Sequence, residues 1–376
     1  MLIGLVGLPN KGKTTLFNAL TQQNAQVANY PFTTIKPNEG VAFASVFCPH
    51  VALGLKKCDP KNSACENGIR KIPVKILDVA GLVSGASIGK GMGNQFLADL
   101  SRADALIVVA DASGQTDDEG NPTQDHNPCR DVEILEQELD AWFLQVVTRN
   151  AQKTKGKPLS EFIESLSGLD VQKNNVTRAL QEHGIPENSR EWNELDLQKI
   201  ATSIRENTKP LVVAANKADL KNDVSGLKEL GHPVFKTSGE MALAHQKAVK
   251  NGFAKQENGQ LTAASSDPKI VSAIQKINAF GDDGVQALLD HVVFDVLNQI
   301  VVFPVEDETH FANNFGKVLP DAFLLVKGST PLDLAEKVHS DLKKGFLYAV
   351  DCKTRKRLGK DAVLESGAVV KIVSAK

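Results

Sequence analysis

The chain has 376 residues, of which 42% are hydrophobic and 23% are charged, a balance typical of a globular protein with two or three domains. Its formal net charge of −2 excludes binding of nucleic acid through overall charge, so any such surface has to be local. The sequence lacks an apolar run of the roughly 18 residues that a membrane-spanning helix needs, and its first residues form an apolar strand with no basic segment before it. We therefore expect neither a membrane partner nor a secretory signal, and the oligomeric state stays open.

A phosphate-binding loop stands near the start of the chain. Residues 7–14 read G-L-P-N-K-G-K-T, which matches G-x-x-x-x-G-K-[ST], and they lie between an apolar strand at 2–6 and a helical pattern at 15–20. The glycines allow backbone N–H groups to surround phosphate oxygens, and the helix N-terminus adds its dipole. Lys13 is expected to reach the β- and γ-phosphates, and Thr14 to bind Mg²⁺. The candidate nucleotide-binding residues of this loop are Gly7, Pro9, Asn10, Lys11, Gly12, Lys13, Thr14 and Thr15.

A polar loop with flanking prolines, residues 29–40, follows the first predicted helix and precedes a predicted strand at 41–47. In proteins with a phosphate loop, a mobile loop at this place supplies a threonine to Mg²⁺ and senses the γ-phosphate. From the residues alone, either Thr33 or Thr34 could have this role. An ordinary connecting loop is the alternative.

The next predicted strand, 72–77, ends in the motif D-x-x-G, with Asp78 and Gly81 as its defining residues. We expect Asp78 to hold Mg²⁺ through water and the Gly81 amide to contact the γ-phosphate. The following residue is Leu82, where many GTPases have a glutamine that orients the attacking water. An apolar side chain cannot orient water, so this function is missing here.

Cysteines and a histidine gather between these two predicted strands. Thiol and imidazole ligands this close in sequence could hold a structural Zn²⁺ ion, the candidate ligands being Cys48, His50, Cys58 and Cys65. Their spacing is not a paired C-x-x-C knuckle, so loosely placed free thiols are the alternative. The chain has five cysteines, and together with a phosphate loop of the cytosolic type they indicate a reducing compartment, so we expect a cytoplasmic protein.

A base-reading motif follows a second buried strand. The apolar runs at 105–112 and 210–215 are typical of central strands in a parallel sheet, and the second leads into N-K-A-D at 216–219. The Asp219 carboxylate can accept hydrogen bonds from N1–H and the exocyclic amine of guanine, whereas adenine has no donors there. After the strand at 234–236, a small-residue turn suits a backbone N–H donated to guanine O6. The candidate residues of the base site are Asn216, Lys217, Asp219, Ser238 and Gly239.

The order of motifs predicts an α/β fold, a P-loop NTPase of the TRAFAC GTPase type with a mostly parallel sheet. A helical pattern after residue 132 predicts a coiled-coil-like insertion. A hairpin of two long helices is one arrangement that fits this pattern. Short strands around one helix, 332–342, predict a final α+β domain compatible with a β-grasp. The expected domains are a G domain at 1–125 and 208–300, a helical insertion at 126–207 and a β-grasp domain at 301–376.

The final domain also carries a cluster of basic residues. A solvated charged turn and a contact to RNA are both compatible with such a cluster. Its members are Lys343, Lys344, Lys353, Arg355, Lys356, Arg357 and Lys360.

Together these motifs resemble the Obg-type translation-factor GTPases, most closely the YchF-like branch and its archaeal members with cysteines before the D-x-x-G strand. The resemblance covers almost the whole chain. Besides the phosphate loop it rests on Y-P-F-T-T at 30–34, D-V-A-G-L-V at 78–83 and N-Q-F-L at 94–97, and on a terminal module like the TGS domain. It implies that Thr34 senses Mg²⁺, that Leu82 replaces the catalytic glutamine, and that the partner is the ribosome or its RNA.

The resemblance and the motifs together predict a GTPase switch that uses Mg²⁺, with GTP and GDP as ligands. The best-known YchF proteins have an altered base motif and prefer ATP, but N-K-A-D is intact here, which favours GTP. Turnover should be slow without a glutamine or an arginine finger, and Asn10 stands where related GTPases hold K⁺. The candidate catalytic residues are Lys13, Thr34, Gly81 and Asn10. The alternatives are an ATPase of the same architecture, a small-molecule kinase, and a ribosome- or RNA-binding module in which hydrolysis is incidental.

Overall fold

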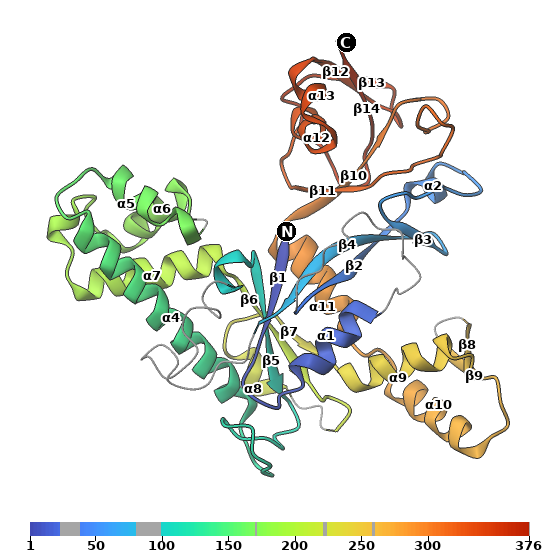
Figure 1. The fold of residues 1–376 in the computed structure, drawn as a ribbon, viewed down its shortest axis with the longest axis horizontal. Coiled ribbons are helices and arrows are strands. Elements are labelled where there is room, and N and C mark those ends of the chain that lie inside the picture. Colours follow the sequence, from blue (N-terminus) through green and yellow to red (C-terminus); the bar gives the residue numbers. More distant parts are fainter. Residues whose placement is uncertain (23–37, 80–98, 170, 221–223, 258–259, 376) are drawn as a thin grey trace. The chain divides into compact units, whose positions relative to one another are not determined.

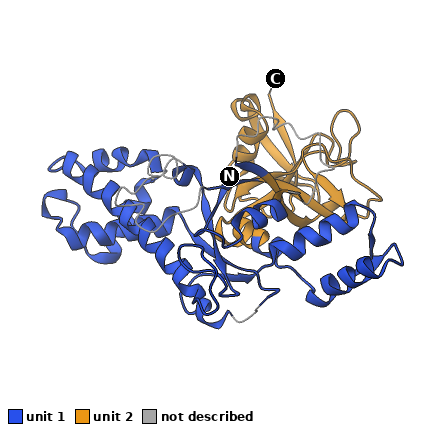
Figure 2. Cartoon of the chain, turned by 60° about the horizontal axis from the view of Figure 1, so that its bottom comes forward, with its two compact units in different colours: residues 1–20, 38–40, 75–288 blue, residues 21–37, 41–74, 289–376 orange. Residues whose placement is uncertain are grey.

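The computed structural model describes residues 1–22, 38–79, 99–169, 171–220, 224–257 and 260–375. The chain forms two compact units, shown in Figure 2: one contains Met1–Leu20, Asn38–Gly40 and Lys75–Leu288, and the other contains Thr21–Pro37, Val41–Val74 and Leu289–Lys376. Within the described residues, no helix combines the length and the apolarity that crossing a membrane requires.

The described strands of the G domain form a 7-stranded sheet with the order β2-β4-β1-β5-β6-β7, and β3 pairs with β4 (Figure 1). β1 runs parallel to β4 and β5, and β5, β6 and β7 continue in parallel, which confirms the expected mostly parallel sheet. Apolar runs form its centre because these strands are buried on both faces. The strands are β1 (Leu2–Val6), β2 (Glu39–Phe47), β3 (Ala64–Glu66), β4 (Ile69–Asp78), β5 (Ala105–Asp111), β6 (Leu211–Asn216) and β7 (Val234–Lys236).

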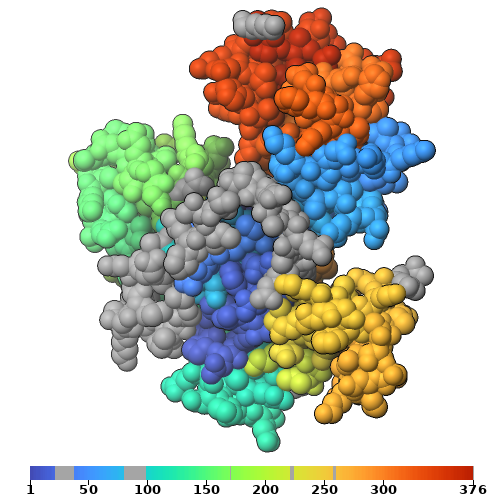
Figure 3. All heavy atoms as spheres, turned by 45° about the vertical axis from the view of Figure 1, so that its right-hand side comes forward, coloured from blue at the N-terminus to red at the C-terminus, as the bar shows by residue number. Residues whose placement is uncertain are grey.

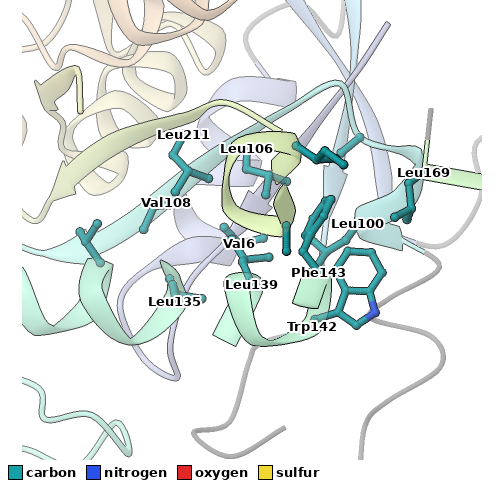
Figure 4. Close-up of a cluster of buried hydrophobic side chains, with 14 of the residues drawn as sticks. Val6, Leu100, Leu106, Val108, Leu135, Leu139, Trp142, Phe143, Leu169 and Leu211 are labelled. Carbon is teal, nitrogen blue, oxygen red and sulfur yellow. The ribbon is translucent and has the colours of Figure 1, made fainter. Parts of the chain in front are cut away.

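The main core lies between this sheet and α4 (Pro128–Lys153). Asn127 starts the helix, because its side chain accepts a hydrogen bond from the Cys129 N–H and a proline occupies the first helical position. Apolar residues at helical spacing then face the strands. Figure 4 shows part of this core, with side chains that include Val6, Leu106, Val108, Leu135, Leu139 and Phe143.

The segment after β5 is helical, as expected, but it is not a hairpin of two long helices. Its described part contains α4, α5 (Leu159–Ser165), α6 (Lys173–His183) and α7 (Glu194–Thr208), with 3₁₀ turns at Ser167–Leu169 and Ser189–Glu191. Gly184 ends α6 in the left-handed conformation, at φ 62°. Gly156 and Pro158 therefore separate α4 from α5, and Gly184 and Pro186 separate α6 from α7.

The remaining elements of the first unit include a hairpin that the sequence did not predict. Besides the short helix α2 (Pro49–Ala52) of the second unit, the chain forms α1 (Lys13–Gln22), α8 (Ser225–Lys228), α9 (Gly239–Lys250), β8 (Ala254–Glu257), β9 (Gln260–Ala263), α10 (Pro268–Phe280) and α11 (Val285–His291). α11 continues as a π-helical turn at Val292–Val296. In Figure 3, the yellow segment around α9 and α10 forms a compact knob, which has its own small core.

The C-terminal domain has a 5-stranded sheet in its described part, with the order β11-β10-β14-β12-β13. β10 and β14 are parallel and the other pairs are antiparallel, which confirms the predicted α+β fold. The single helix expected at 332–342 is divided at His339, whose extended backbone (φ −164°) separates two helices. The elements are β10 (Gln299–Val305), β11 (Phe323–Val326), α12 (Pro331–Val338), α13 (Ser340–Lys344), β12 (Phe346–Asp351), β13 (Lys356–Leu358) and β14 (Val369–Ser374).

Candidate functional site

The phosphate loop connects β1 to α1 and depends on its glycines. Gly12 has φ 88°, and a Cβ atom there would lie 2.4 Å from Asn216 Nδ2, so a side chain has neither the conformation nor the space it needs. A Cβ atom on Gly7 would lie 3.0 Å from the Val109 carbonyl oxygen on β5. The loop therefore packs tightly against the strand ends, which leaves its backbone at the edge of the sheet.

Lys13, Thr14 and Asp78 meet at the start of α1. Lys13 Nζ forms an ion pair with the Asp78 carboxylate, and the Thr14 hydroxyl lies 3.4 Å from Asp78 Oδ2. β1 and β4 are parallel neighbours, so the D-x-x-G strand ends beside the phosphate loop. A hydroxyl and a carboxylate are hard oxygen donors, so these residues fit Mg²⁺.

Asn216 joins the phosphate loop to the base-reading region. Its side-chain Nδ2 donates to the carbonyl oxygens of Lys11 (3.2 Å) and Gly12 (3.4 Å), and its Oδ1 accepts from the Gly239 N–H (3.1 Å). A Cβ atom on Gly239 would lie 3.0 Å from the backbone nitrogen of Leu16 on α1, so this glycine permits close packing. The Asn216 side chain therefore links the phosphate loop and the start of α9 to the end of β6.

Lys217 has a left-handed backbone, with φ 60°, and its side chain bridges two segments. Nζ donates to the Asn10 carbonyl oxygen at 3.0 Å and to Asp111 Oδ2 at 2.7 Å. Burial alone would raise the pKa of Asp111, but hydrogen bonds from Lys217, Ser113 and Thr116 hold that pKa below its ordinary value. Asp111 is therefore an ionised anchor at the end of β5.

Asp219, the candidate base-reading residue, accepts a hydrogen bond from the Ser238 hydroxyl at 2.6 Å. Ser238 also caps α9, because its Oγ accepts from the Met241 N–H at 3.1 Å. The backbone N–H of Ser238 donates to the Asp283 carbonyl oxygen at 3.0 Å, which ties this turn to the segment before α11. The carboxylate is thus oriented by a residue that is itself fixed.

The sequence did not indicate that Lys11 is buried. Its side chain is 0% exposed, and Nζ lies 2.8 Å from Asp131 Oδ1 and 2.8 Å from the Thr116 carbonyl oxygen. Asp131 Oδ1 also lies 2.7 Å from His126 Nε2, and Asp131 Oδ2 accepts from the Asp111 N–H. Burial raises the pKa of Asp131, although the hydrogen bond from Lys11 acts in the opposite direction.

The other candidate residues of the phosphate loop lie between β1 and α1 or in the first turn of α1. Asn10 has φ 59°, and its Nδ2 donates to the Gly120 carbonyl oxygen at 2.9 Å. Pro9 is half-buried against Gly120, and Thr15 is half-buried in the first turn of α1. The described residues thus bring the loop, Asp78 and the N-K-A-D motif to one edge of the sheet. Thr33, Thr34, Gly81 and Leu82 lie outside the described residues.

The second unit holds a cluster of metal-ligand type. One atom from each of four side chains, three thiol sulfurs and an imidazole nitrogen, lies within 4.8 Å of every other. The members are Cys48, His50, Cys58 and Cys65, the residues expected from the sequence. The thiols are free and lie close together, so this geometry is compatible with a metal site.

Comparison with known proteins agrees with these motifs. Residues 2–147 match the family described as 50S ribosome-binding GTPase, and residues 316–374 match the TGS domain. Residues 214–307 match the G4 motif-containing domain of Obg-like GTPases that resemble YGR210.

Three relatives extend the similarity over the whole chain. A GTP-binding protein of Methanocaldococcus jannaschii is 43% identical over 393 residues, covering 100% of this chain and 99% of its own. The ribosome-binding ATPase YchF of Buchnera aphidicola (from Acyrthosiphon pisum) is 27% identical, covering 92% and 86%. The crystal structure of a GTP-binding protein from Pyrococcus horikoshii OT3 is 39% identical, with a TM-score of 0.81 and 100% of both chains covered. The chain therefore belongs to the Obg- and YchF-like family of GTP-binding proteins, P-loop hydrolases with a C-terminal TGS domain.

Proposed function

We propose that this protein is a GTP-selective, Mg²⁺-dependent hydrolase that acts as a nucleotide-controlled switch on ribosomes. The observation that carries the proposal is the position of Asp219, oriented by Ser238 and joined through Asn216 to the phosphate loop. A carboxylate placed there can pair with both donors on the guanine edge. Adenine would leave the carboxylate without hydrogen-bond donors. A site with such a mismatch commonly discriminates against the wrong ligand by a factor of about 10⁴ or more.

Lys13 would bind the β- and γ-phosphates of the nucleotide through its ammonium group. That group lies beside the Asp78 carboxylate, and the Thr14 hydroxyl lies next to the same carboxylate. Asp78 and Thr14 would hold Mg²⁺, which supplies neutralisation of phosphate charge when bound.

Thr34 and Gly81 complete the proposed switch as the residues that sense the γ-phosphate. With Leu82 in the place of a glutamine, we expect slow intrinsic turnover. We assign Asn10 to K⁺ coordination, because its Nδ2 is engaged by Gly120 and its side-chain oxygen is the group suited to a monovalent cation. The candidate Zn²⁺ ligands, at residues 48–65, belong to the second compact unit.

The potassium assignment predicts a cation effect on hydrolysis. Steady-state GTP hydrolysis should be at least about tenfold faster in K⁺ than in Na⁺ at equal ionic strength, since K⁺ would replace the charge of an arginine finger. Asn10→Ala should remove this difference. Equal rates of the unmodified protein in the two salts would contradict the assignment.

Association with ribosomes is proposed from two observations. The Buchnera relative is named for ribosome binding, and the segment 353–360, which includes the β12–β13 turn and β13 of the TGS domain, exposes a group of basic side chains. Among the described residues this group has no ion-pair partner, and its members are Lys353, Arg355, Lys356 and Lys360. Exposed unpaired cations suit the phosphates of RNA. Such a partner would place the protein in the cytoplasm.

An ATP-preferring enzyme is the second candidate, because the Buchnera relative is named an ATPase. A competition experiment separates the two. Labelled GDP is displaced from the full-length protein by unlabelled GTP or ATP in the presence of Mg²⁺. We expect GTP to bind at least about 100-fold more tightly than ATP. Equal affinities, or tighter binding of ATP, would refute guanine selectivity.

A further inference from the structure

A cluster of thiols and an imidazole lies between β2 and β4 in the sequence and is not used by the proposed hydrolysis. Cys48 follows β2, His50 lies in α2, and Cys65 lies in β3. Cys58 comes from the segment between α2 and β3, which has no helix or strand. The N–H of Cys48 donates to the Gly68 carbonyl oxygen at 2.8 Å, so the β3–β4 turn brings the ligand-bearing segments together.

Two distances within this cluster match those between the ligands of a tetrahedral metal site, and all four ligand atoms lie within 4.8 Å of one another. Cys48 Sγ lies 3.8 Å from Cys58 Sγ, and Cys65 Sγ lies 3.7 Å from His50 Nδ1. Ligand atoms about 2.0–2.3 Å from a tetrahedral zinc ion lie about 3.4–3.8 Å from one another. A disulfide would need a sulfur–sulfur distance of about 2.05 Å, and the cysteines of this chain are free thiols.

Arg70 provides an independent indication of negative charge in this cluster. Its side chain is fully buried, and its Nη1 lies 3.7 Å from Cys58 Sγ. Among the described residues no carboxylate lies within ion-pair distance of Arg70, although its charge acts on Asp321, and its Nε has no hydrogen-bond partner. Its Nη2 donates to the Leu319 carbonyl oxygen, which is uncharged. A buried guanidinium with no anion in direct contact is unfavourable. Zinc bound to three thiolates and one neutral imidazole carries one net negative charge, which balances this arginine.

The residues between two of these ligands contact the C-terminal domain, within the same compact unit. Asp59 N–H donates to the Val318 carbonyl oxygen at 2.8 Å, and Asp59 Oδ2 accepts from the Val318 N–H at 3.2 Å. Asn62 donates to the Ala322 carbonyl oxygen at 3.0 Å and accepts from the Ala322 N–H at 2.9 Å. The blue segment that lies against the orange domain in Figure 3 contains these residues.

We propose that Cys48, His50, Cys58 and Cys65 bind one structural Zn²⁺ ion, and that this ion holds residues 58–65 in the shape that binds the TGS domain. Residues 53–63 have no regular secondary structure to fix their backbone, so their hydrogen-bonding groups face the domain only if another interaction orders them. Cys58 precedes and Cys65 follows the residues that form the contact. Binding of both thiolates to one ion fixes the backbone between them. The metal thereby orders the segment that follows β2, and this segment then binds the C-terminal domain through its hydrogen bonds.

The first part of the test measures metal content. Full-length protein, purified without chelator, should contain about one zinc per chain by elemental analysis. Cys58→Ser and Cys65→Ser should reduce the content to below about one-tenth, whereas Cys129→Ser, outside the cluster, should leave it unchanged. Cobalt exchanged into the unmodified protein should show the charge-transfer bands of thiolate ligands. Absence of zinc, another metal in its place, or zinc retained after both cluster substitutions would overturn the site.

The second part measures contact with the TGS domain by amide hydrogen exchange. Chelation of zinc from the unmodified protein should speed exchange at Val318 and Ala322 at least about tenfold, while amides of β5 keep their protection. Asn62→Ala should free the Ala322 amide and keep the zinc, which separates the contact from the metal. Unchanged exchange at both amides after complete zinc removal would refute the claim that zinc orders residues 58–65 for their contact with the TGS domain. Neither result depends on nucleotide binding, so failure here leaves the proposed hydrolase untouched.

Discussion

Lys11 of the phosphate loop and Lys217, which donates to the loop, are held by carboxylates that no motif marks. Lys11 is paired with Asp131 in a fully buried contact, and Lys217 is paired with Asp111 at the end of β5. Removing one partner of a buried pair is expensive, because the remaining charge cannot be hydrated. The shape of the loop that meets the phosphates therefore depends on acidic residues from β5 and α4.

Replacing Asp111 by Asn tests this dependence through pH. We expect Asp111→Asn to lower the free energy of unfolding at pH 7 by about 3 kcal/mol, because Lys217 loses its counter-charge. The folded-state pKa of Asp111 lies below the ordinary value of 3.8, so its stabilisation is complete above that value and is lost as the pH falls through the folded-state pKa.

The measurement is denaturant unfolding of both proteins between pH 7 and pH 3. The difference between them should be constant near neutrality and shrink below about pH 4, where the protonated acid resembles the amide. A difference that stays the same at acidic pH would show that the charge of Asp111 is not the cause.

The residues predicted from sequence were those that belong to short motifs. The phosphate loop, Asp78 and N-K-A-D each carry their meaning within a few positions, and the structure brings their described members together. Thr116 and Asp131 are different, because they lie in the loop after β5 and in the first turn of α4, more than 100 positions from Lys11 in sequence. No local pattern records such a contact. Asp111 had a weaker signal, as an acid at the end of a buried apolar strand.

At the level of helices, α4 and α7 are joined by one buried arginine. Arg205 of α7 is 2% exposed and pairs with Asp140 (2.7 Å) and Glu136 (2.9 Å) of α4. The His232 imidazole, whose Nε2 lies 3.3 Å from Glu136 Oε1, and the charge of Arg205 hold the pKa of Glu136 below its ordinary value. The periodic apolar pattern predicted that this segment is helical, but helix ends depend on such tertiary pairs, and the short helices α5 and α6 were therefore missed.

Replacing Arg205 by Ala tests whether a buried ion pair contributes more to the free energy of unfolding than an exposed one. We expect Arg205→Ala to lower the free energy of unfolding by about 3 kcal/mol, because two carboxylates lose their partner and a buried volume is emptied. The matched control is Arg178→Ala, which removes an exposed pair on α6 and should have a much smaller effect. Thermal unfolding of the two variants compares them, and equal losses would contradict the assigned burial.

At the level of the whole chain, sequence patterns predicted both domain types but not the contact between distant segments of the second unit. The change to short alternating strands marked the C-terminal domain, because a β-strand records its period locally. Asn62 and Ala322 are 260 positions apart, and neither side of their contact is regular in sequence. The boundaries at 125, 207 and 300 stay predictions, although α4 begins at Pro128 and β10 crosses residue 300.

The basic turn of the TGS domain leads to a prediction for ribosome binding. Changing Lys353, Arg355, Lys356 and Lys360 to Ser should reduce co-sedimentation with ribosomes at least about tenfold and flatten its salt dependence, because phosphate contacts are lost. The control removes the same number of exposed charges elsewhere, at Lys247, Lys250, Lys255 and Lys269. Equal losses in both variants would show a non-specific charge effect, and an unchanged first variant would remove this turn from the interface.

The measurement that tests the central claim most directly is the nucleotide specificity of Asp219→Asn. Dissociation constants of GDP and xanthosine diphosphate are determined by titration for the unmodified protein, for Asp219→Asn and for the exposed control Asp361→Asn. If Asp219 reads guanine, the substitution should weaken GDP at least about 100-fold and strengthen the xanthine nucleotide, since an amide can donate to the xanthine 2-oxygen. The control should match the unmodified protein. Unchanged GDP affinity in Asp219→Asn would contradict the account.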